Sequence, residues 1–213
     1  MEHHLTTYIT HDTLISALGF GTQENLEAIR SYHSGITLQT DKRIADTPLL
    51  AATLSQDRLQ QQAEAIGVSG YPRMEQLFIL TINELIRQSG QTLEDKTCGL
   101  ILSTTKGNID LLARHTEHPD EAVFLWKMAE RIGHFFEAAN QVEVISNACI
   151  SGVSALVVAK RWIESGRYKR VIVAGGDILS HFITSGFLSF RSVSAHRCRP
   201  YDIQRDGLSL GEA

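Results

Sequence analysis

Two short runs in this sequence are apolar at nearly every position, so a β-strand formed from either run has no polar face to turn toward solvent. They are "CGLILSTT" (residues 98–105) and "RVIVAGGD" (residues 170–177). A strand with one solvated face alternates apolar and polar residues, whereas uninterrupted apolar runs are typical of strands covered on both faces. The two runs therefore predict a sheet with helices on both of its faces.

Helical periodicity separates the predicted strands. The segment "MEQLFILTINELIRQSG" (74–90) carries apolar residues at helical spacing and ends at Gly90, a residue typical of helix C-termini. Further helices are predicted over 22–32, 122–138 and 149–165, and further strands between residue 8 and Gly19 and over 141–146. This alternation predicts an α/β fold with a parallel or mixed sheet.

Composition narrows the function classes. The 213 residues suffice for one sizeable domain or two small ones, and a net charge of −4 predicts no large basic surface for nucleic acid. No apolar run approaches the length that crosses a membrane. The three cysteines are odd in number and far apart, which argues against a disulfide framework and predicts a cytoplasmic protein.

Cys149 is the strongest candidate for chemistry. It follows a short apolar run, and Asn147 before it is a good N-cap residue. This spacing predicts Cys149 in the first turn of a helix, where free amides and the helix dipole lower a thiol pKa and can bind an oxyanion. A buried structural cysteine is the alternative, because free cysteine is among the most buried residue types.

The other candidates have simpler explanations. Cys98 lies inside an apolar strand and is predicted to be core, and Cys198 is predicted to be an ordinary loop residue. The segment "HTEH" (115–118) is interpreted as a solvated loop, and no zinc, dinucleotide or P-loop motif is present, so neither metal nor cofactor is predicted. The charged segment "RPYDIQRDG" (199–207) is interpreted as a loop tied by arginine–aspartate pairs.

Four of these segments together resemble the N-terminal half of a β-ketoacyl synthase of the thiolase-like superfamily. The segment "LISALGFGTQENLEAIRSYHSGI" resembles its opening strand, turn and helix, and "NACISG" (147–152) its nucleophile motif. "RVIVAGGD" resembles the following strand, and "RPYDIQRDGLSLGEA" (199–213) a motif usually written R-P-F-D-x-x-R-D-G-x-x-x-G-E-[GA]. The segment "STTKGN" (103–108) departs from the family's G-T-G-x-G-G, and Ile150 narrows the space near the cysteine sulfur.

The resemblance implies a 3-oxoacyl-acyl-carrier-protein synthase of fatty-acid, polyketide or polyene synthesis. Such enzymes condense an acyl thioester with malonyl carried on acyl carrier protein. Cys149 would be the acyl-accepting nucleophile, its amide half of the oxyanion hole, and the substrates would arrive on phosphopantetheine. The four charged residues of the 199–207 loop (Arg199, Asp202, Arg205 and Asp206) would hold that loop in place.

The family's condensation step also needs two histidines, in H-G-T-x-T and N-x-x-F-G-F-G-G contexts, and a lysine. None of the nine histidines here lies in such a context. Residues 1–213 are therefore interpreted as one N-terminal ketosynthase domain, a fragment that stops before the last strand of its half and cannot condense alone.

Two alternatives to an enzyme of this class stay open. A non-catalytic partner subunit, like a chain-length factor, usually lacks the cysteine, and a cysteine hydrolase of another class would need a base that no motif supplies. The resemblance also predicts pairing through the strand before the nucleophile, as a homodimer with Val142 and Val144 near the axis or as a ketosynthase heterodimer.

Overall fold

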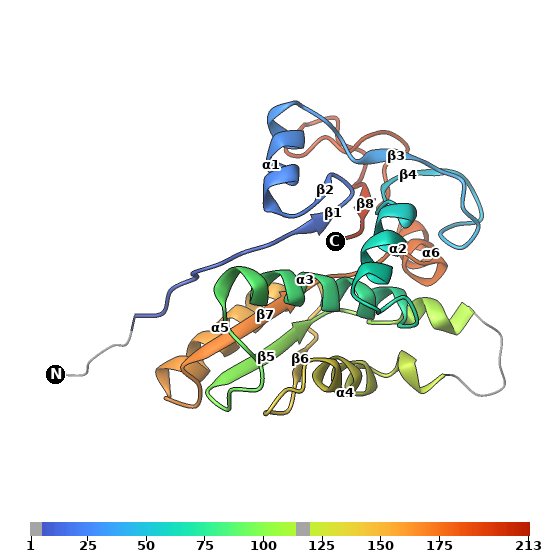
Figure 1. Ribbon diagram of the computed structural model, residues 1–213. Helices are drawn as coiled ribbons and strands as arrows, with labels where there is room; N and C mark the ends of the chain where they lie inside the picture. The colour runs from blue at the N-terminus through green and yellow to red at the C-terminus, as the bar shows by residue number, and fades with distance from the viewer. Residues whose placement is uncertain (1–5, 114–119) are drawn as a thin grey trace. The chain divides into compact units, whose positions relative to one another are not determined.

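The computed structural model describes residues 6–113 and 120–213. The chain divides into two compact units (Figure 1). The first unit comprises residues 1–13, 62–108 and 121–177, and the second comprises residues 14–61, 109–120 and 178–213. Helix α2 (Gln56–Ala65) contributes residues to both, with 56–61 in the second unit and 62–65 in the first.

A parallel sheet forms the centre of the first unit. Its strands are β5 (Cys98–Ser103), β6 (Glu143–Ile145) and β7 (Arg170–Gly175), in the order β6-β5-β7. Both neighbours run parallel to β5, and all six residues of β5 are buried. The prediction of a strand covered on both faces is confirmed here, because β5 has a strand on each side and helices above and below.

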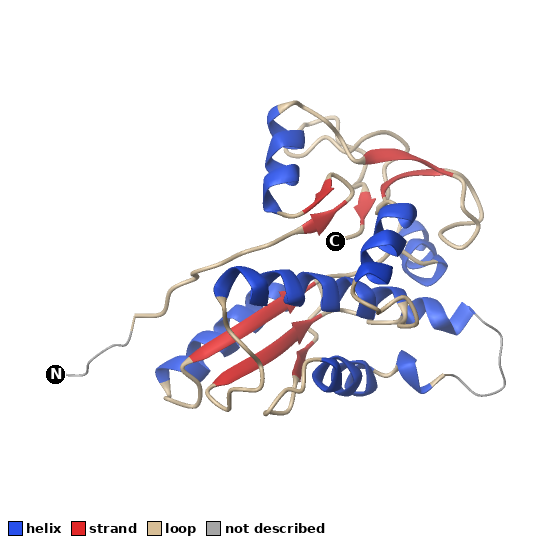
Figure 2. Cartoon of the chain, viewed as in Figure 1, coloured by secondary structure: helices blue, strands red, loops and turns tan. Residues whose placement is uncertain are grey.

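Three helices cover this sheet (Figure 2): α3 (Arg73–Ser89), α4 (Leu125–Phe135) and α5 (Ser151–Glu164). Helix α5 packs Ala155 and Ala159 against Ile101 on one face. Glu143 of β6 is paired with Ile101 of β5, so their side chains point to the same face of the sheet. The side chain of Val142, one residue earlier, points to the opposite face, where its Cγ2 lies close to Gly133 of α4. Helices α4 and α3 contact each other, so they share the second face. The short helix η2 (Glu121–Val123) leads into α4.

The second unit holds two small sheets. Strands β1 (Ile15–Ser16) and β2 (Gly19–Phe20) form a hairpin, and β3 (Ile36–Gln39) pairs antiparallel with β4 (Leu49–Ala52), which pairs parallel with β8 (Leu210–Gly211). The helices are α1 (Thr22–Arg30), η1 (Ile109–Ala113) and α6 (His181–Ser189). Its core gathers Ala45, Leu49, Ala51, Leu179 and Leu210.

Most predicted elements are confirmed, but several boundaries differ, and the helix expected over 122–138 is limited to Leu125–Phe135. The strand expected from residue 8 is limited to β1, because no strand among the described residues pairs with Tyr8 and Ile9, which are 76% and 79% exposed. The helix expected over 149–165 begins at Ser151. Gly90 ends α3 in the left-handed conformation, at φ +64°, as its position predicted.

Candidate active site

The carboxyl ends of β5, β6 and β7 meet at one edge of the first unit's sheet, the usual location of sites in parallel α/β sheets. Asp177, just beyond β7, accepts hydrogen bonds from the hydroxyl of Thr104 at 2.8 Å and from the backbone N–H and hydroxyl of Thr105, both at 3.0 Å. The hydroxyl of Ser146, just beyond β6, donates to the carbonyl of Thr105 at 3.4 Å. The ends of the three strands are thereby held together.

Cys149 lies at this edge, on a tight turn between β6 and α5, and it is exposed. Ala148 adopts the left-handed conformation at φ +43°, which is costly for a residue other than glycine. Two backbone hydrogen bonds close the turn, from Ile150 to the carbonyl of Asn147 at 3.1 Å and from Ser151 to the carbonyl of Ala148 at 3.2 Å. The alternative of a buried structural cysteine is therefore wrong for Cys149.

The prediction that Asn147 caps the helix is also wrong. The N-cap residue is Ile150, so Cys149 precedes the first turn of α5. The left-handed Ala148 delays the helix, and the side-chain amide of Asn147 donates to the hydroxyl of Ser154 at 3.3 Å instead of accepting from the helix. Ser151 has the stabilising role in this turn, because its hydroxyl bonds to backbone groups of both Asn147 and Ala148.

The other two cysteines lie in the environments that their sequence contexts predict. Cys98 is 1% exposed, and burial raises the pKa of its thiol. Cys198 is half-buried in a loop, where its backbone N–H donates to the hydroxyl of Ser209. All three cysteines are free thiols.

A buried polar network supports the loop after β5, and the sequence analysis missed it. The amide of Asn108 donates to Glu75 Oε1 and to the carbonyl of Ala122, both at 2.8 Å. Glu75 Oε2 pairs with Arg131 Nε at 3.0 Å, and Glu75 is fully buried. A glutamate within an amphipathic helix is usually solvent-exposed, so only its place among the apolar residues of α3 could have indicated burial.

Gly107 belongs to the same loop. Its φ is +56°, and a Cβ there would approach the side chain of Leu125 to 2.7 Å. The left-handed backbone favours glycine at this position, and the contact with Leu125 shows that the loop "STTKGN" is packed closely even with one glycine where the family pattern has four.

The charged loop over 199–207 lies in the second unit, and its expected arginine–aspartate side-chain pairs are wrong. Arg199 donates to the carbonyl of Gln204 and Arg205 to the carbonyl of Asp202, both at 2.9 Å. Asp206 accepts from the hydroxyl of Ser194 at 2.5 Å and pairs with the ring of His196 at 3.2 Å. The carboxylates have other partners, since Asp202 accepts the backbone N–H of Gln204 and Asp206 is bonded to Ser194 and His196.

The end of the same motif contributes a buried carboxylate. Glu212 is 5% exposed and accepts from the backbone N–H groups of Leu54 at 2.9 Å and Leu179 at 3.0 Å. It joins three separate segments of the second unit, and the sequence analysis assigned it no role.

The described residues contain neither a candidate metal site nor a helix that could cross a membrane. Over residues 6–113 and 120–213, no cluster of three or more histidine, cysteine or acidic side chains is arranged to hold a metal ion. The "HTEH" segment lies outside these residues. Among the described helices, none has both the length and the apolarity to cross a membrane.

The fold matches solved ketosynthases along nearly the whole chain. The ishigamide ketosynthase/chain length factor gives a TM-score of 0.75 at 19% identity, over 94% of this chain and 54% of the other. The ketosynthase ApeO, solved in complex with its chain length factor ApeC from Xenorhabdus doucetiae, gives 0.72 at 18%, over 96% and 55%. The α/β arrangement is therefore that of the N-terminal half of the thiolase-like ketosynthase fold.

The sequence comparisons define the family. The model of the β-ketoacyl synthase N-terminal domain matches residues 17–213, and the chain belongs to this family. The ketoacyl synthase alpha subunit of the tetracenomycin polyketide synthase from Streptomyces glaucescens is 24% identical over 191 residues, which are 76% of this chain and 45% of that protein. A highly reducing polyketide synthase from Eupenicillium brefeldianum is 28% identical over 89 residues, 40% of this chain and 4% of that protein. The chain thus spans less than half of these relatives.

Proposed function

We propose that this chain is the acyl-accepting half of a 3-oxoacyl-acyl-carrier-protein synthase and that Cys149 is its nucleophile. The observation that carries the proposal is the exposed thiol of Cys149, held on a strained turn at the carboxyl edge of a parallel sheet within a family-matched "NACISG" segment. Strained turns at such edges are typical of activated residues.

The proposed step is a transacylation. The thiolate of Cys149 attacks the carbonyl carbon of an acyl thioester on the phosphopantetheine of acyl carrier protein. The negative charge that develops on the carbonyl oxygen is stabilised by backbone N–H groups of the turn, that of Cys149 among them. The carbon–sulfur bond to the carrier then breaks, the carrier thiolate takes up a proton, and the acyl group remains on Cys149.

Condensation requires groups beyond these 213 residues in this proposal. The chain covers 54% and 55% of the two solved ketosynthases, and the family's histidine motifs do not occur in it. One side of α5 is apolar and exposed, because Val153, Leu156 and Val157 lie at helical spacing and are 64%, 45% and 42% exposed. Further polypeptide of the complete enzyme would cover this apolar side.

The proposal also includes partners. Acyl carrier protein would supply the substrate, and the complete enzyme would be a dimer in the cytoplasm. Two of the structural relatives carry chain length factors in their names, which supports a second ketosynthase-like chain as the other subunit. A non-catalytic subunit is the second candidate function, and Cys149 favours the enzyme over it.

The test is to incubate the chain with an acyl-loaded and then a malonyl-loaded carrier protein. We expect an acyl adduct at Cys149 by mass spectrometry and no ketoacyl product or released carbon dioxide. The Cys149→Ala variant should take up no acyl group, and the matched Cys198→Ala variant should take it up as the native chain does.

Two outcomes contradict the proposal. An intact fold with no adduct at Cys149 would remove the nucleophile role and favour a non-catalytic subunit. Condensation that depends on Cys149 would show a complete catalytic set and refute the requirement for a second half.

A further inference from the structure

The residue directly after the candidate nucleophile is large and apolar. Ile150 is 56% exposed, so its side chain adds little to the core. It is the N-cap residue of α5, yet it makes no side-chain hydrogen bond to the helix. Isoleucine is also among the least favourable N-cap residues, because its side chain has no oxygen to accept from the first amides. The stability of α5 therefore gives no reason for an isoleucine at this position.

The turn fixes Ile150 close to the thiol. Its backbone N–H donates to the carbonyl of Asn147 at 3.1 Å, so residues 147–150 form a four-residue turn in which Cys149 is the third member. Isoleucine branches at Cβ, and this branching restricts rotation of its side chain. A stiff, branched group is therefore held next to the residue that carries the thiol.

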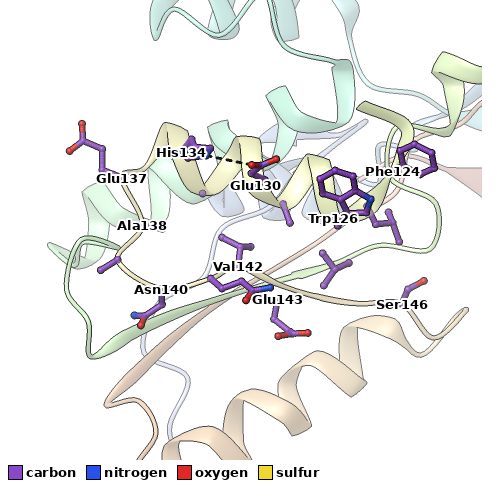
Figure 3. Close-up of a pocket in the computed structure, with 16 residues that line it drawn as sticks. Phe124, Trp126, Glu130, His134, Glu137, Ala138, Asn140, Val142, Glu143 and Ser146 are labelled. Atoms are coloured by element: carbon purple, nitrogen blue, oxygen red, sulfur yellow. Dashed lines mark ion pairs between the residues drawn. The ribbon is translucent and has the colours of Figure 1, made fainter. Parts of the chain in front are cut away.

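The surroundings of Cys149 within the same segment are otherwise small or open. Ala148 precedes it, and a Cβ placed on Gly152 would meet no atom within 4 Å. On the strand side, a groove of about 860 Å³ runs between α4 and β6, and Ser146, which lines it, is three residues before Cys149 (Figure 3). Within this segment, crowding at the thiol therefore comes from Ile150.

We infer that Ile150 is a specificity-determining residue, which makes Cys149 accept acyl groups whose α-carbon is unbranched. This inference rests on the proposed function, because it names the substrate class of the same thiol. When the thiolate attacks, the carbonyl carbon becomes tetrahedral and its α-carbon comes within two bonds of the sulfur. A methyl group on that α-carbon meets the branched side chain of Ile150, whereas the hydrogen of a straight chain does not. One such group in a restricted site changes a rate by about 10- to 200-fold.

Val153 provides a matched control. It is also β-branched, it is 64% exposed, and it lies in the first turn of α5, outside the turn that carries the thiol. If Ile150 served only as part of the apolar side of α5, truncating either residue would have the same effect. A role in specificity belongs to Ile150 and leaves Val153 without effect.

The first measurement needs no carrier protein. Cys149 is alkylated with iodoacetamide and with 2-iodopropanamide, which carries one more methyl group on the reacting carbon, and in both cases the thiolate displaces iodide. The ratio of the two rates, followed by peptide mapping, is divided by the ratio for glutathione, so the intrinsic difference between the reagents cancels. We expect a normalised ratio of at least about ten for the native chain, Ile150→Val and Val153→Ala, and about one for Ile150→Ala.

The second measurement uses the acyl groups themselves. Butanoyl and 2-methylpropanoyl groups are isomers, and each is loaded on the same carrier protein. We expect transfer of the butanoyl group to Cys149 to be at least about tenfold faster in the native chain. Ile150→Ala should abolish this preference, and Ile150→Val and Val153→Ala should keep it. Circular dichroism should show all variants folded, because both truncated side chains are exposed and Ile150 makes no cap bond.

Equal transfer of the two isomers in the native chain would overturn the inference and leave the proposed function standing. A preference that Val153→Ala reduces as much as Ile150→Ala does would also overturn it, because bulk elsewhere on α5 would then suffice. Selective alkylation that depends on Ile150, with no acylation from either carrier, would contradict the proposed function and still support selection by Ile150 at this thiol.

Discussion

The hydroxyl oxygen of Ser151 accepts a hydrogen bond from the backbone N–H of Asn147 at 2.8 Å, across the turn that carries Cys149. The same hydroxyl donates to the carbonyl of Ala148 at 2.7 Å, and Ser151 is 6% exposed. One buried side chain therefore holds the turn closed on both sides of the left-handed Ala148.

Replacing Ser151 by alanine should loosen this turn. We expect the free energy of unfolding to fall by about 1–2 kcal/mol, because two backbone groups lose a buried partner. Acylation of Cys149 should slow, since the thiol is no longer held in place. The Ser165→Ala variant is the control, because it removes one hydrogen bond at the other end of α5. Equal acylation rates in the two variants would contradict a positioning role for Ser151.

Cys149 should be alkylated before the other two cysteines. Limiting iodoacetamide at neutral pH, followed by peptide mapping, should label Cys149 first. Cys98 should react last, because it is 1% exposed and burial raises its pKa above the ordinary thiol range. Preferential labelling of Cys98 or Cys198 in a folded sample would refute the assignment of the nucleophile.

Asp177 should contribute to the stability of the first unit. Asp177→Ala removes three hydrogen bonds to Thr104 and Thr105, so we expect a loss of about 2–3 kcal/mol in urea unfolding. The exposed Glu94 provides a control on the same unit, and Glu94→Ala should change stability by less than about 0.5 kcal/mol. Similar losses in both variants would show that the hydrogen bonds of Asp177 contribute little.

Asp206 should stabilise its loop in a pH-dependent way. Hydrogen bonds from Ser194 and then His196 hold the pKa of Asp206 below its usual range. A lowered pKa in the folded chain gives stability that is present above the ordinary aspartate pKa of about 4 and is lost as the pH falls below it. Asp206→Asn should therefore lower the melting temperature at pH 7, and the difference from the native chain should shrink toward pH 3.

The control for this prediction lies in the same loop. Asp202 accepts the backbone N–H of Gln204 at 2.7 Å, a bond that an asparagine oxygen can also accept, so Asp202→Asn should show no such pH dependence. Labelling of Cys149 should be unaltered by Asp206→Asn. Lower labelling at an unchanged melting temperature would mean that the loop acts in the chemistry and has no role in stability.

The buried Glu75 should matter far more than an exposed glutamate of the same helix. Glu75→Gln removes a fully buried carboxylate that pairs with Arg131, whose side chain is 35% exposed, and we expect a loss of about 1.5–3 kcal/mol. Glu84 pairs with Arg87 on the surface of α3, so Glu84→Gln should cost less than about 1 kcal/mol. Equal losses in thermal or urea unfolding would rule out a special role for the buried network.

Much of the fold could be predicted from the sequence because its signals are local. The apolar runs that become β5 and β7 and the periodic segment that becomes α3 need no knowledge of their neighbours. Gly90 ends α3 as predicted, because only its own left-handed conformation is required. The strand expected from residue 8 was wrong, since a strand depends on a partner that the local sequence does not contain.

The sequence by itself also determined the family and singled out Cys149, because a short ordered set of motifs carries both. Only the tertiary structure placed Cys149 one residue before the cap of α5 and brought Ser151 and Asp177 to their partners. It also paired Glu75 with Arg131 and left Glu143 on an open edge. Hydrogen bonds and charges depend on which distant segments meet, and that meeting is decided by packing of the whole chain.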